Sequence, residues 1–279
     1  MPPQSPINER PTVYSATDRR YVTALARGLD LLRCFAPGDQ WLGNIDIARR
    51  TGLPKATVAR LAYTLCALGY LEYSAERSKY ALGIGVLSLG FSMLANLDVR
   101  RIARPAMQRL AEHAQASVSL GVRERLEMVY VENCRAQAPL ALGIGVGARL
   151  PVATSSMGLA WLCGLDEPQR ESVLGEIRQS ERSRWPKLRS GIDQAVAQYR
   201  ELGFVTSIGQ WEPDINAVGC PLVIGQGLVV MSFNCGGPAT RLTPQRLLND
   251  IGPRLATMVA EVRTAIEGAG AGAGTARPR

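Results

Sequence analysis

Residues 44–63 constrain the fold more than any other stretch, because they predict two short helices joined by a tight turn. Gly52 can adopt the positive φ angle that such a turn requires. Ala48 is small where the first helix must approach the second, and Val58 lies on the inward face of the second helix, where it can pack against Ala48 and Ile45. This order and spacing is typical of a helix-turn-helix, whose second helix enters the major groove of DNA. An ordinary helix pair in a small bundle is the alternative.

The outward face of the second helix carries the side chains that we expect to meet DNA. Basic and hydroxyl groups alternate there with small residues, so the helix can contact both base edges and phosphates. The candidate DNA-binding residues on this helix are Lys55, Ala56, Thr57, Arg60 and Tyr63.

A β-hairpin is predicted directly after this helix. Gly69 can end the helix, residues 70–73 and 79–82 are typical of strands, and the residues between them are polar. A hairpin in this place is the wing of a winged helix, which would bring Arg77 and Lys79 beside the sugar-phosphate backbone. A purely structural hairpin with solvated charges is the alternative.

Charge is distributed unevenly along the chain, which carries a formal net charge of +8. Residues 19–63 hold eight basic and three acidic side chains, a net charge of +5. Residues 101–268 hold eighteen and sixteen, a net charge of +2. Much of the positive excess therefore coincides with the predicted DNA-binding motif, which favours attraction to phosphate.

Composition excludes several classes of protein. The chain has 279 residues, enough for two domains, and it contains no run of 18 apolar residues and no signal peptide. We therefore expect a cytoplasmic protein that does not cross a membrane. The cysteines are scattered without the spacing of a metal site or a disulfide framework, so we expect reduced core thiols and no metal or cofactor; they are Cys34, Cys66, Cys134, Cys163, Cys220 and Cys235.

Five segments are predicted along the chain. An apolar stripe formed by Leu87, Phe91 and Leu94 indicates a linker helix, whose stripe faces either the core or a second subunit. The segments are a disordered N-terminus (1–18), a winged helix-turn-helix domain (19–83), the linker helix (84–97), a C-terminal domain (98–267) and a disordered tail (268–279).

The elements expected in these segments favour an α+β fold class with an antiparallel sheet in the C-terminal domain. The apolar spacing of Ala24, Leu25, Leu29, Leu31, Leu32 and Phe35 predicts the first helix. Asp98 can cap a helix whose first turns contain Pro105. Strands are predicted at 117–122, 126–132, 139–146, 203–208, 216–224 and 228–235, and further helices from Ser155, at 167–178, at 191–202 and at 243–267.

The whole pattern resembles IclR-type bacterial transcriptional regulators over residues 19–267. The motifs that carry this resemblance are residues 51–61, 80–83, 98–105, 147–151, 212–213 and 237–244. The resemblance implies a winged helix, a linker helix and a GAF-like effector-binding domain. It also implies homodimers formed through the DNA-binding end, with tetramers as a further level of assembly.

The resemblance also implies an effector pocket. Its matching positions here are Ser155, Ser156, Met157, Gly158, Ser207, Gln210, Asn216, Ala217, Gly219, Cys220, Ser232 and Asn234. A helix N-terminus with serine hydroxyls suits the carboxylate of a small organic acid, although a simple helix cap is an equally good interpretation.

The chain departs from the family pattern in the pocket. It has Leu159 and Ala153 where the family commonly has Lys and His, and residues 207–210 replace an acidic run. These losses of charge argue against a metal there. Together with Trp211, Met157 and Phe233 they favour an aromatic or more apolar ligand.

The sequence therefore predicts a DNA-binding transcriptional regulator that a small organic acid modulates. An enzyme acting on small acids, with the winged helix as an accessory module, is the alternative; so is a constitutive DNA binder with a vestigial pocket. His113 is the only histidine and has no nucleophile near it in sequence, and residues 143–147 lack the pattern of a phosphate loop. Cys220 and Cys235 would be redox sensors only if they were exposed.

Overall fold

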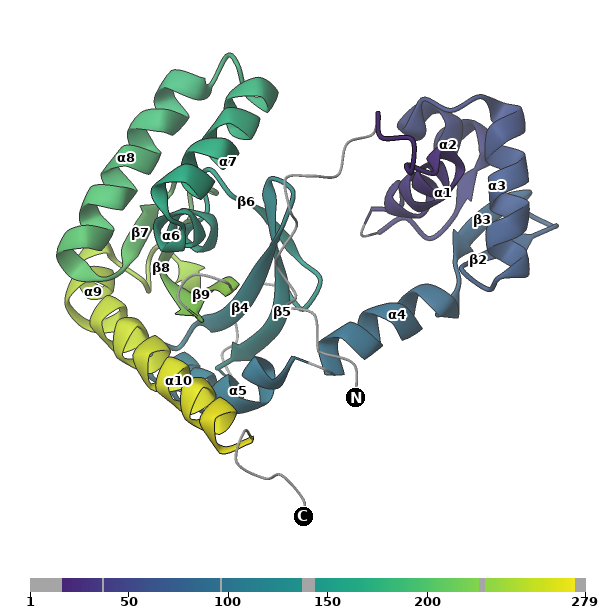
Figure 1. Ribbon diagram of the computed structural model, residues 1–279. Coiled ribbons are helices and arrows are strands. Elements are labelled where there is room, and N and C mark those ends of the chain that lie inside the picture. Colours follow the sequence, from purple (N-terminus) through teal and green to yellow (C-terminus); the bar gives the residue numbers. More distant parts are fainter. Residues whose placement is uncertain (1–16, 37, 96, 137–143, 226–228, 274–279) are drawn as a thin grey trace. The chain divides into compact units, whose positions relative to one another are not determined.

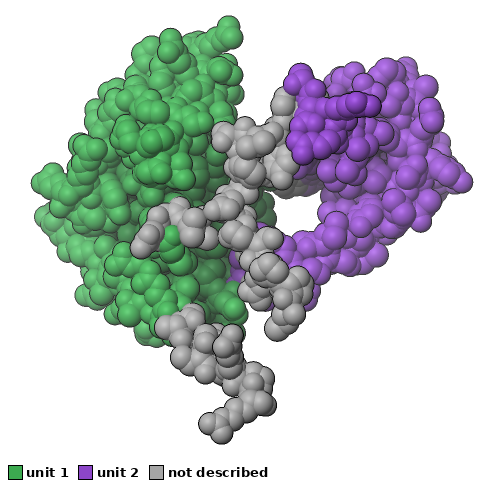
Figure 2. All heavy atoms as spheres, viewed as in Figure 1, with its two compact units in different colours: residues 1–9, 98–279 green, residues 10–97 purple. Residues whose placement is uncertain are grey.

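The computed structural model describes residues 17–36, 38–95, 97–136, 144–225 and 229–273. The described part divides into two compact units, and the boundary between them in the sequence lies between Leu97 and Asp98 (Figure 2). No helix among the described residues is long and apolar enough to cross a membrane. The predicted disordered N-terminus lies outside the described residues up to Ala16.

The N-terminal unit is a helix-turn-helix followed by a β-hairpin. The helices enclose a small core formed by Leu31, Leu42, Ile47, Val58, Ala62 and Leu71. A short extra strand, β1, joins the hairpin to make an antiparallel sheet of order β1-β3-β2. The elements are α1 (Thr23–Arg33), β1 (Leu42–Gly43), α2 (Asn44–Thr51), α3 (Lys55–Ala67), β2 (Leu71–Ser74), β3 (Lys79–Leu82) and α4 (Ile84–Ala95).

Two glycines end the helices of the motif as expected. Gly52 follows α2 with a φ angle of 70°, and Gly69 lies just beyond α3 with a φ angle of 75°. Both adopt the left-handed conformation that a side chain with a Cβ atom disfavours. The predicted partner Ile45 is wrong, because Ile45 is 63% exposed whereas Ile47 is fully buried. Helix α2 therefore contributes Ile47 to the core instead of Ile45.

The apolar residues of the first and last helices of this unit are largely exposed. In α1, Leu31 is buried, but Leu25 is 63% and Leu29 is 44% exposed. The apolar residues of this helix therefore lie on both its buried and its exposed face. None of the residues of α4 is buried, and Leu87 and Phe91 are 64% and 68% exposed. The linker stripe therefore does not face the core of its own unit.

The C-terminal unit is built on one antiparallel sheet of order β6-β5-β4-β9-β8-β7. Helices α5 and α10 cover one face, and α6 covers the other with α7 and α8 outside it (Figure 1). The strands are β4 (Ser117–Glu124), β5 (Glu127–Arg135), β6 (Arg149–Pro151), β7 (Val205–Ile208), β8 (Ile215–Ile224) and β9 (Val229–Pro238). The helices are α5 (Asp98–Ala114), α6 (Ser156–Gly164), α7 (Glu167–Ser180), α8 (Trp185–Leu202), α9 (Pro244–Arg246) and α10 (Gly252–Ala273).

Several boundaries in this unit differ from the prediction. Asp98 is the first residue of α5 instead of its cap, and Pro105 lies in the interior of this helix, not in its first turns. The described part of the predicted strand 139–146 is not a strand, and the edge strand β6 follows it instead. A π-helical turn over Leu247–Ile251 joins α9 to α10, which continues to Ala273, beyond the predicted start of the tail.

The start of α6 is pressed onto its surroundings at two glycines. A Cβ atom on Gly219 of β8 would lie 2.2 Å from the carbonyl oxygen of Ser156, and one on Gly158 would lie 2.3 Å from that of Val152. Only a residue without a side chain permits these approaches. The glycines therefore fix where the N-terminus of α6 lies over the sheet.

Candidate functional site

The first candidate site is the outward face of α3. Val58 is fully buried and points to the core, whereas Lys55, Ala56 and Arg60 are exposed and Tyr63 is 78% exposed. Thr57 is half-buried. Four of the five candidate residues on α3 thus lie on the solvent side of their unit, as the helical spacing predicts.

Ion pairs offset the positive charge of α2 in this unit. Arg49 pairs with Asp46 at 3.1 Å, and Arg50 forms a bidentate pair with Asp39. The Arg50 guanidinium holds the pKa of the Asp39 carboxyl below its usual value. No carboxylate among the described residues pairs with Lys55 or Arg60, so these cations are available to an external anion.

The hairpin forms where the sequence places it. Tyr73 pairs with Tyr80 and Ser74 with Lys79 in antiparallel register. Arg77 and Lys79 are exposed, and the backbone N–H of Arg77 donates to Ser74 Oγ at 3.3 Å. The hairpin can therefore serve as a wing.

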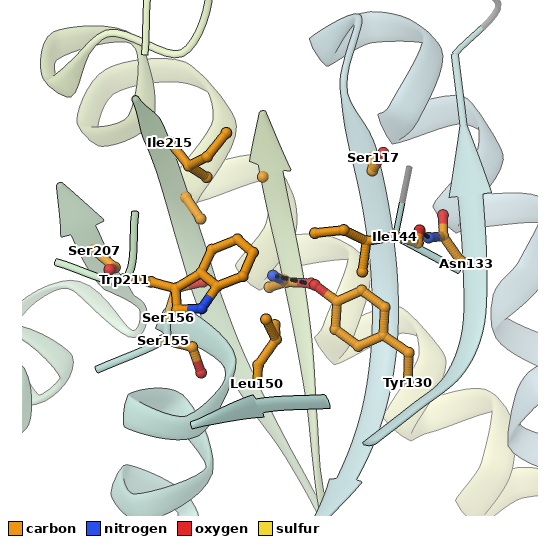
Figure 3. A pocket seen from close by; sticks show the side chains of 13 residues that line it. Ser117, Tyr130, Asn133, Ile144, Leu150, Ser155, Ser156, Ser207, Trp211 and Ile215 are labelled. Atoms are coloured by element: carbon orange, nitrogen blue, oxygen red, sulfur yellow. Dashed lines mark hydrogen bonds between the residues drawn. The ribbon is translucent and has the colours of Figure 1, made fainter. Parts of the chain in front are cut away.

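The second candidate site is a cavity on the face of the sheet that α6 covers (Figure 3). Its empty volume is about 460 Å³, including solvent at the mouth. None of the described residues that line it is charged; they are Ser117, Tyr130, Asn133, Ile144, Leu150, Ser155, Ser156, Ser207, Trp211, Ile215, Ala217, Asn234 and Gly236.

Three polar atoms on the cavity wall have no hydrogen-bond partner among the described residues. They are Ser156 Oγ, Asn133 Oδ1 and Asn234 Oδ1. Ser156 and Asn234 are only 2% and 5% exposed. A buried polar atom without a partner costs about 1–3 kcal/mol. All three residues line the cavity, so a ligand that reaches these atoms would supply the missing bonds.

Other polar groups on the wall already have partners. Ser155 caps α6, because its Oγ accepts from Gly158 N–H at 3.1 Å and donates to Pro151 O at 2.7 Å. Ser207 Oγ donates to Thr154 O at 3.0 Å. Ser155 thus has the capping role that the sequence left open, and Ser156 is the serine with a free hydroxyl.

Tyr130 lies at the centre of the cavity wall. Its hydroxyl accepts from Asn234 Nδ2 at 3.1 Å, the contact drawn as a dashed line in Figure 3. Burial raises the pKa of the Tyr130 phenol, although the bond from Asn234 opposes the shift. The hydroxyl is therefore neutral near pH 7 and able to donate.

Seven of the twelve predicted pocket residues do not line the cavity. Met157 packs on Gly121, Gly158 on Val152 and Gly219 on Ser156, so these three fill contacts around α6. Gln210 is exposed, and the Ser232 hydroxyl bonds to Cys220 O. The predicted residues that do line it are Ser155, Ser156, Ser207, Ala217 and Asn234.

Strand alternation explains why other predicted residues do not line the cavity. Neighbouring residues of β8 point to opposite faces of the sheet, so Ala217 lines the cavity and Asn216 does not. Asn216 Nδ2 instead donates to Leu242 O at 2.9 Å. Cys220 and Phe233 are paired across β8 and β9 on that same far face. Alternation along β8 and β9 would have placed Asn216, Cys220 and Phe233 on the far face from the sequence alone.

The sequence missed the wall contributed by β4 and β5. Ser117, Tyr130 and Asn133 lie on strands that precede every predicted pocket position in the chain, and their alternation gives no sign of a ligand. Trp211 was expected to favour an aromatic ligand and does line the cavity, unlike Met157 and Phe233.

Other chemistry has little support among the described residues. Burial raises the pKa of the Cys163, Cys220 and Cys235 thiols to about 12, so the reactive thiolate form is scarce near pH 7. The single histidine, His113, bonds to Asp250 at 3.0 Å and lies outside the cavity. No group of three potential metal-binding side chains occurs within the described ranges.

Comparison with known proteins identifies the family. The model of the IclR helix-turn-helix domain matches residues 24–75, and that of the IclR C-terminal domain matches residues 91–264. This chain belongs to the IclR family of bacterial transcriptional regulators. It is a DNA-binding regulator with an α+β fold: a helix-turn-helix region and a C-terminal domain with an antiparallel sheet.

Individual IclR-family relatives cover almost the whole chain. The transcriptional regulator TsaQ1/TsaQ2 of Comamonas testosteroni is 34% identical over 89% of this chain and 90% of its own length. An IclR-family regulator from Brucella abortus is 45% identical, with a TM-score of 0.84 over 91% of this chain and 95% of that one. An IclR homologue from Microbacterium hydrocarbonoxydans, solved with 4-hydroxybenzoate, shares the fold at 23% identity and a TM-score of 0.69, over 88% of this chain and 100% of that one.

Proposed function

We propose that the exposed face of α3 reads a DNA operator and that the wing binds the adjacent backbone. Lys55 and Arg60 carry this proposal, because they are exposed cations on the helix that the family uses for DNA and no carboxylate in the described ranges pairs with them. An Arg or Lys side chain that reaches a guanine edge contributes about 1–3 kcal/mol of discrimination. Arg77 and Lys79 add phosphate contacts that do not depend on sequence.

The cavity of the C-terminal unit is the proposed effector site. Because none of the described lining residues is charged, neutral donors would have to bind an anionic group, and the N-terminus of α6 with the Ser156 hydroxyl provides them. The Trp211 indole and apolar neighbours suit an aromatic ring, and Asn133 and Asn234 offer oxygens to a ligand donor. A small aromatic acid fits this set, as does the 4-hydroxybenzoate of the Microbacterium homologue.

Assembly into homodimers is part of the proposal. Tyr21, Val22, Leu25 and Leu29 of the first helix region and Ile84, Leu87, Leu89, Phe91 and Met93 of α4 are all more than 40% exposed. A second copy that covers these residues would remove a large apolar surface from water. Two recognition helices would then read two half-sites. Sedimentation of the full chain would distinguish the dimer from a tetramer or a monomer.

The effector acts by favouring one of two states of the regulator. It does so only in proportion to its different affinities for the DNA-bound and DNA-free states. The protein would act on chromosomal DNA in the cytoplasm, without catalysing a reaction.

Thermal unfolding with a panel of benzoic acids, 4-hydroxybenzoate among them, tests the effector site. A ligand at ~100 times its dissociation constant adds about 2.7 kcal/mol to the free energy of unfolding. A panel without any stabilising member would favour a constitutive DNA binder. Turnover of the bound acid would instead favour the enzyme.

A further inference from the structure

Trp41 is an unexpected residue on the outer face of the small sheet. It lies one residue before β1, where Leu42 pairs with Tyr80 and Gly43 pairs with Lys79. Leu42 is 5% exposed and faces the core. Because successive residues of a strand point to opposite faces, Trp41 and Gly43 share the outer face with Lys79. The Trp41 ring is not among the residues that form the core of this unit.

The partner of this indole is the wing arginine. The guanidinium carbon of Arg77 lies over the Trp41 ring, 5.1 Å from its centre. Arg77 has no carboxylate partner among the described residues, and it approaches Trp41 from the turn between β2 and β3. The turn itself is held by the bond from Arg77 N–H to Ser74 Oγ and by Ser78, whose φ angle is 51°.

The contact with Trp41 leaves the N–H donors of the Arg77 guanidinium free to bind a phosphate. The cation–π interaction with the indole acts on the charge of the guanidinium and uses none of its N–H donors, which match a phosphate along the edges of the group. A side chain held in this way loses less conformational freedom when it binds.

We propose that Trp41 is a positioning residue for DNA binding, which holds the Arg77 guanidinium ready for a backbone phosphate beside the recognition helix. Trp41 makes no base contact in this scheme. The inference rests on the proposed role of the wing, and it adds a residue outside both the recognition helix and the hairpin.

The test measures how the full-length protein binds a fluorescent duplex of mixed sequence as the salt concentration changes. Each phosphate contact contributes about 0.9 to the slope of log affinity against log salt concentration. Arg77→Ala should reduce the slope by about 0.9 per bound subunit and weaken binding about eightfold at ~0.1 M salt. Trp41→Leu, which keeps an apolar side chain without a π face, should weaken binding about two- to fivefold and reduce the slope in part.

Conservative variants separate positioning from a structural role. Trp41→Phe keeps an aromatic face and should bind like the wild type. The double variant Trp41→Leu with Arg77→Ala should bind no more weakly than Arg77→Ala alone, because both changes remove one interaction. Circular dichroism and thermal unfolding verify that each variant is folded.

The outcomes distinguish this inference from the function on which it rests. If Arg77→Ala leaves the slope unchanged, the wing does not contact phosphate and the proposed role of the wing fails. If Arg77→Ala lowers the slope but Trp41→Leu behaves like the wild type, or Trp41→Phe is as weak as Trp41→Leu, the positioning role is overturned and the wing remains a DNA contact.

Discussion

The DNA-facing surface and the effector cavity are built in opposite ways. The first is exposed and cationic, and most of it comes from one stretch of chain, residues 41–79. The second is buried, has no charged side chain among its described lining residues, and is assembled from strands and loops between Ser117 and Gly236. DNA offers a repeating anionic surface that charge alone attracts, whereas a small acid must be enclosed and matched atom by atom. Single substitutions should therefore affect DNA affinity in the first unit, and stability or ligand affinity in the second.

The largest expected effect concerns the packing that creates the cavity. Gly219→Ala should lower the free energy of unfolding by about 3 kcal/mol, because its Cβ would lie 2.2 Å from the Ser156 carbonyl oxygen. Gly191→Ala on α8 is the matched control: its Cβ would meet nothing within 4 Å, so we expect a gain of about 0.5–1 kcal/mol. Urea unfolding followed by tryptophan fluorescence compares them. Equal losses in both variants would contradict the close approach of α6.

The next effect belongs to the DNA-facing surface alone. Arg60→Ala should reduce the preference for an operator fragment over a mixed-sequence duplex by about 1–3 kcal/mol, while affinity for an effector stays unchanged. Arg178→Ala, an exposed change of equal charge on α7, controls for the loss of net charge. Gel shifts with both duplexes measure the preference. Unchanged discrimination in Arg60→Ala would remove Arg60 from the recognition surface.

A third prediction separates stability from ligand binding in the cavity. Ser156→Ala removes an unpaired buried hydroxyl, so the free energy of unfolding should stay equal or rise by up to about 1 kcal/mol, while the dissociation constant of a bound acid rises about five- to tenfold. Ser232→Ala should do the reverse, because its hydroxyl bonds to Cys220 O and does not line the cavity. Calorimetry and thermal unfolding provide both quantities. Loss of stability in Ser156→Ala would mean that its hydroxyl already has a partner.

The smallest effect is a pH dependence in the C-terminal unit. Partial burial raises the pKa of Asp250, but bonds from Arg254 and His113 outweigh it and hold the pKa below 3.8. A lowered carboxyl pKa contributes stability above the unfolded value, which is lost as the pH falls through the folded value. Asp250→Asn should therefore cost about 0.2–1 kcal/mol near pH 7 and nothing once the pH lies well below 3.8.

The control for this pH effect is Glu201→Gln, an exposed change on α8. Its difference from the wild type measures the background effect of replacing one exposed carboxylate over the same pH range. Urea midpoints of both variants between about pH 2 and pH 7 provide the comparison. A constant difference for Asp250→Asn would show that its ion pairs do not contribute.

The sequence by itself determined the helix-turn-helix, its wing and the antiparallel class of the second unit. These features depend on neighbours: Gly52 and Gly69 end helices locally, and hydrophobic spacing decides which residues of α3 are exposed. The local pattern was still wrong for Ile45 and Leu25, which were expected on the buried face of their helices and are exposed.

Only the tertiary structure decided the cavity. Tyr130 and Asn234 are 104 residues apart, yet their side chains are hydrogen-bonded, and β4 lies between their strands in the sheet. Trp41 and Arg77 likewise meet only because β1 pairs with β3. Contacts between distant segments depend on strand order and register, and these are set by the packing of whole faces, which no local pattern records.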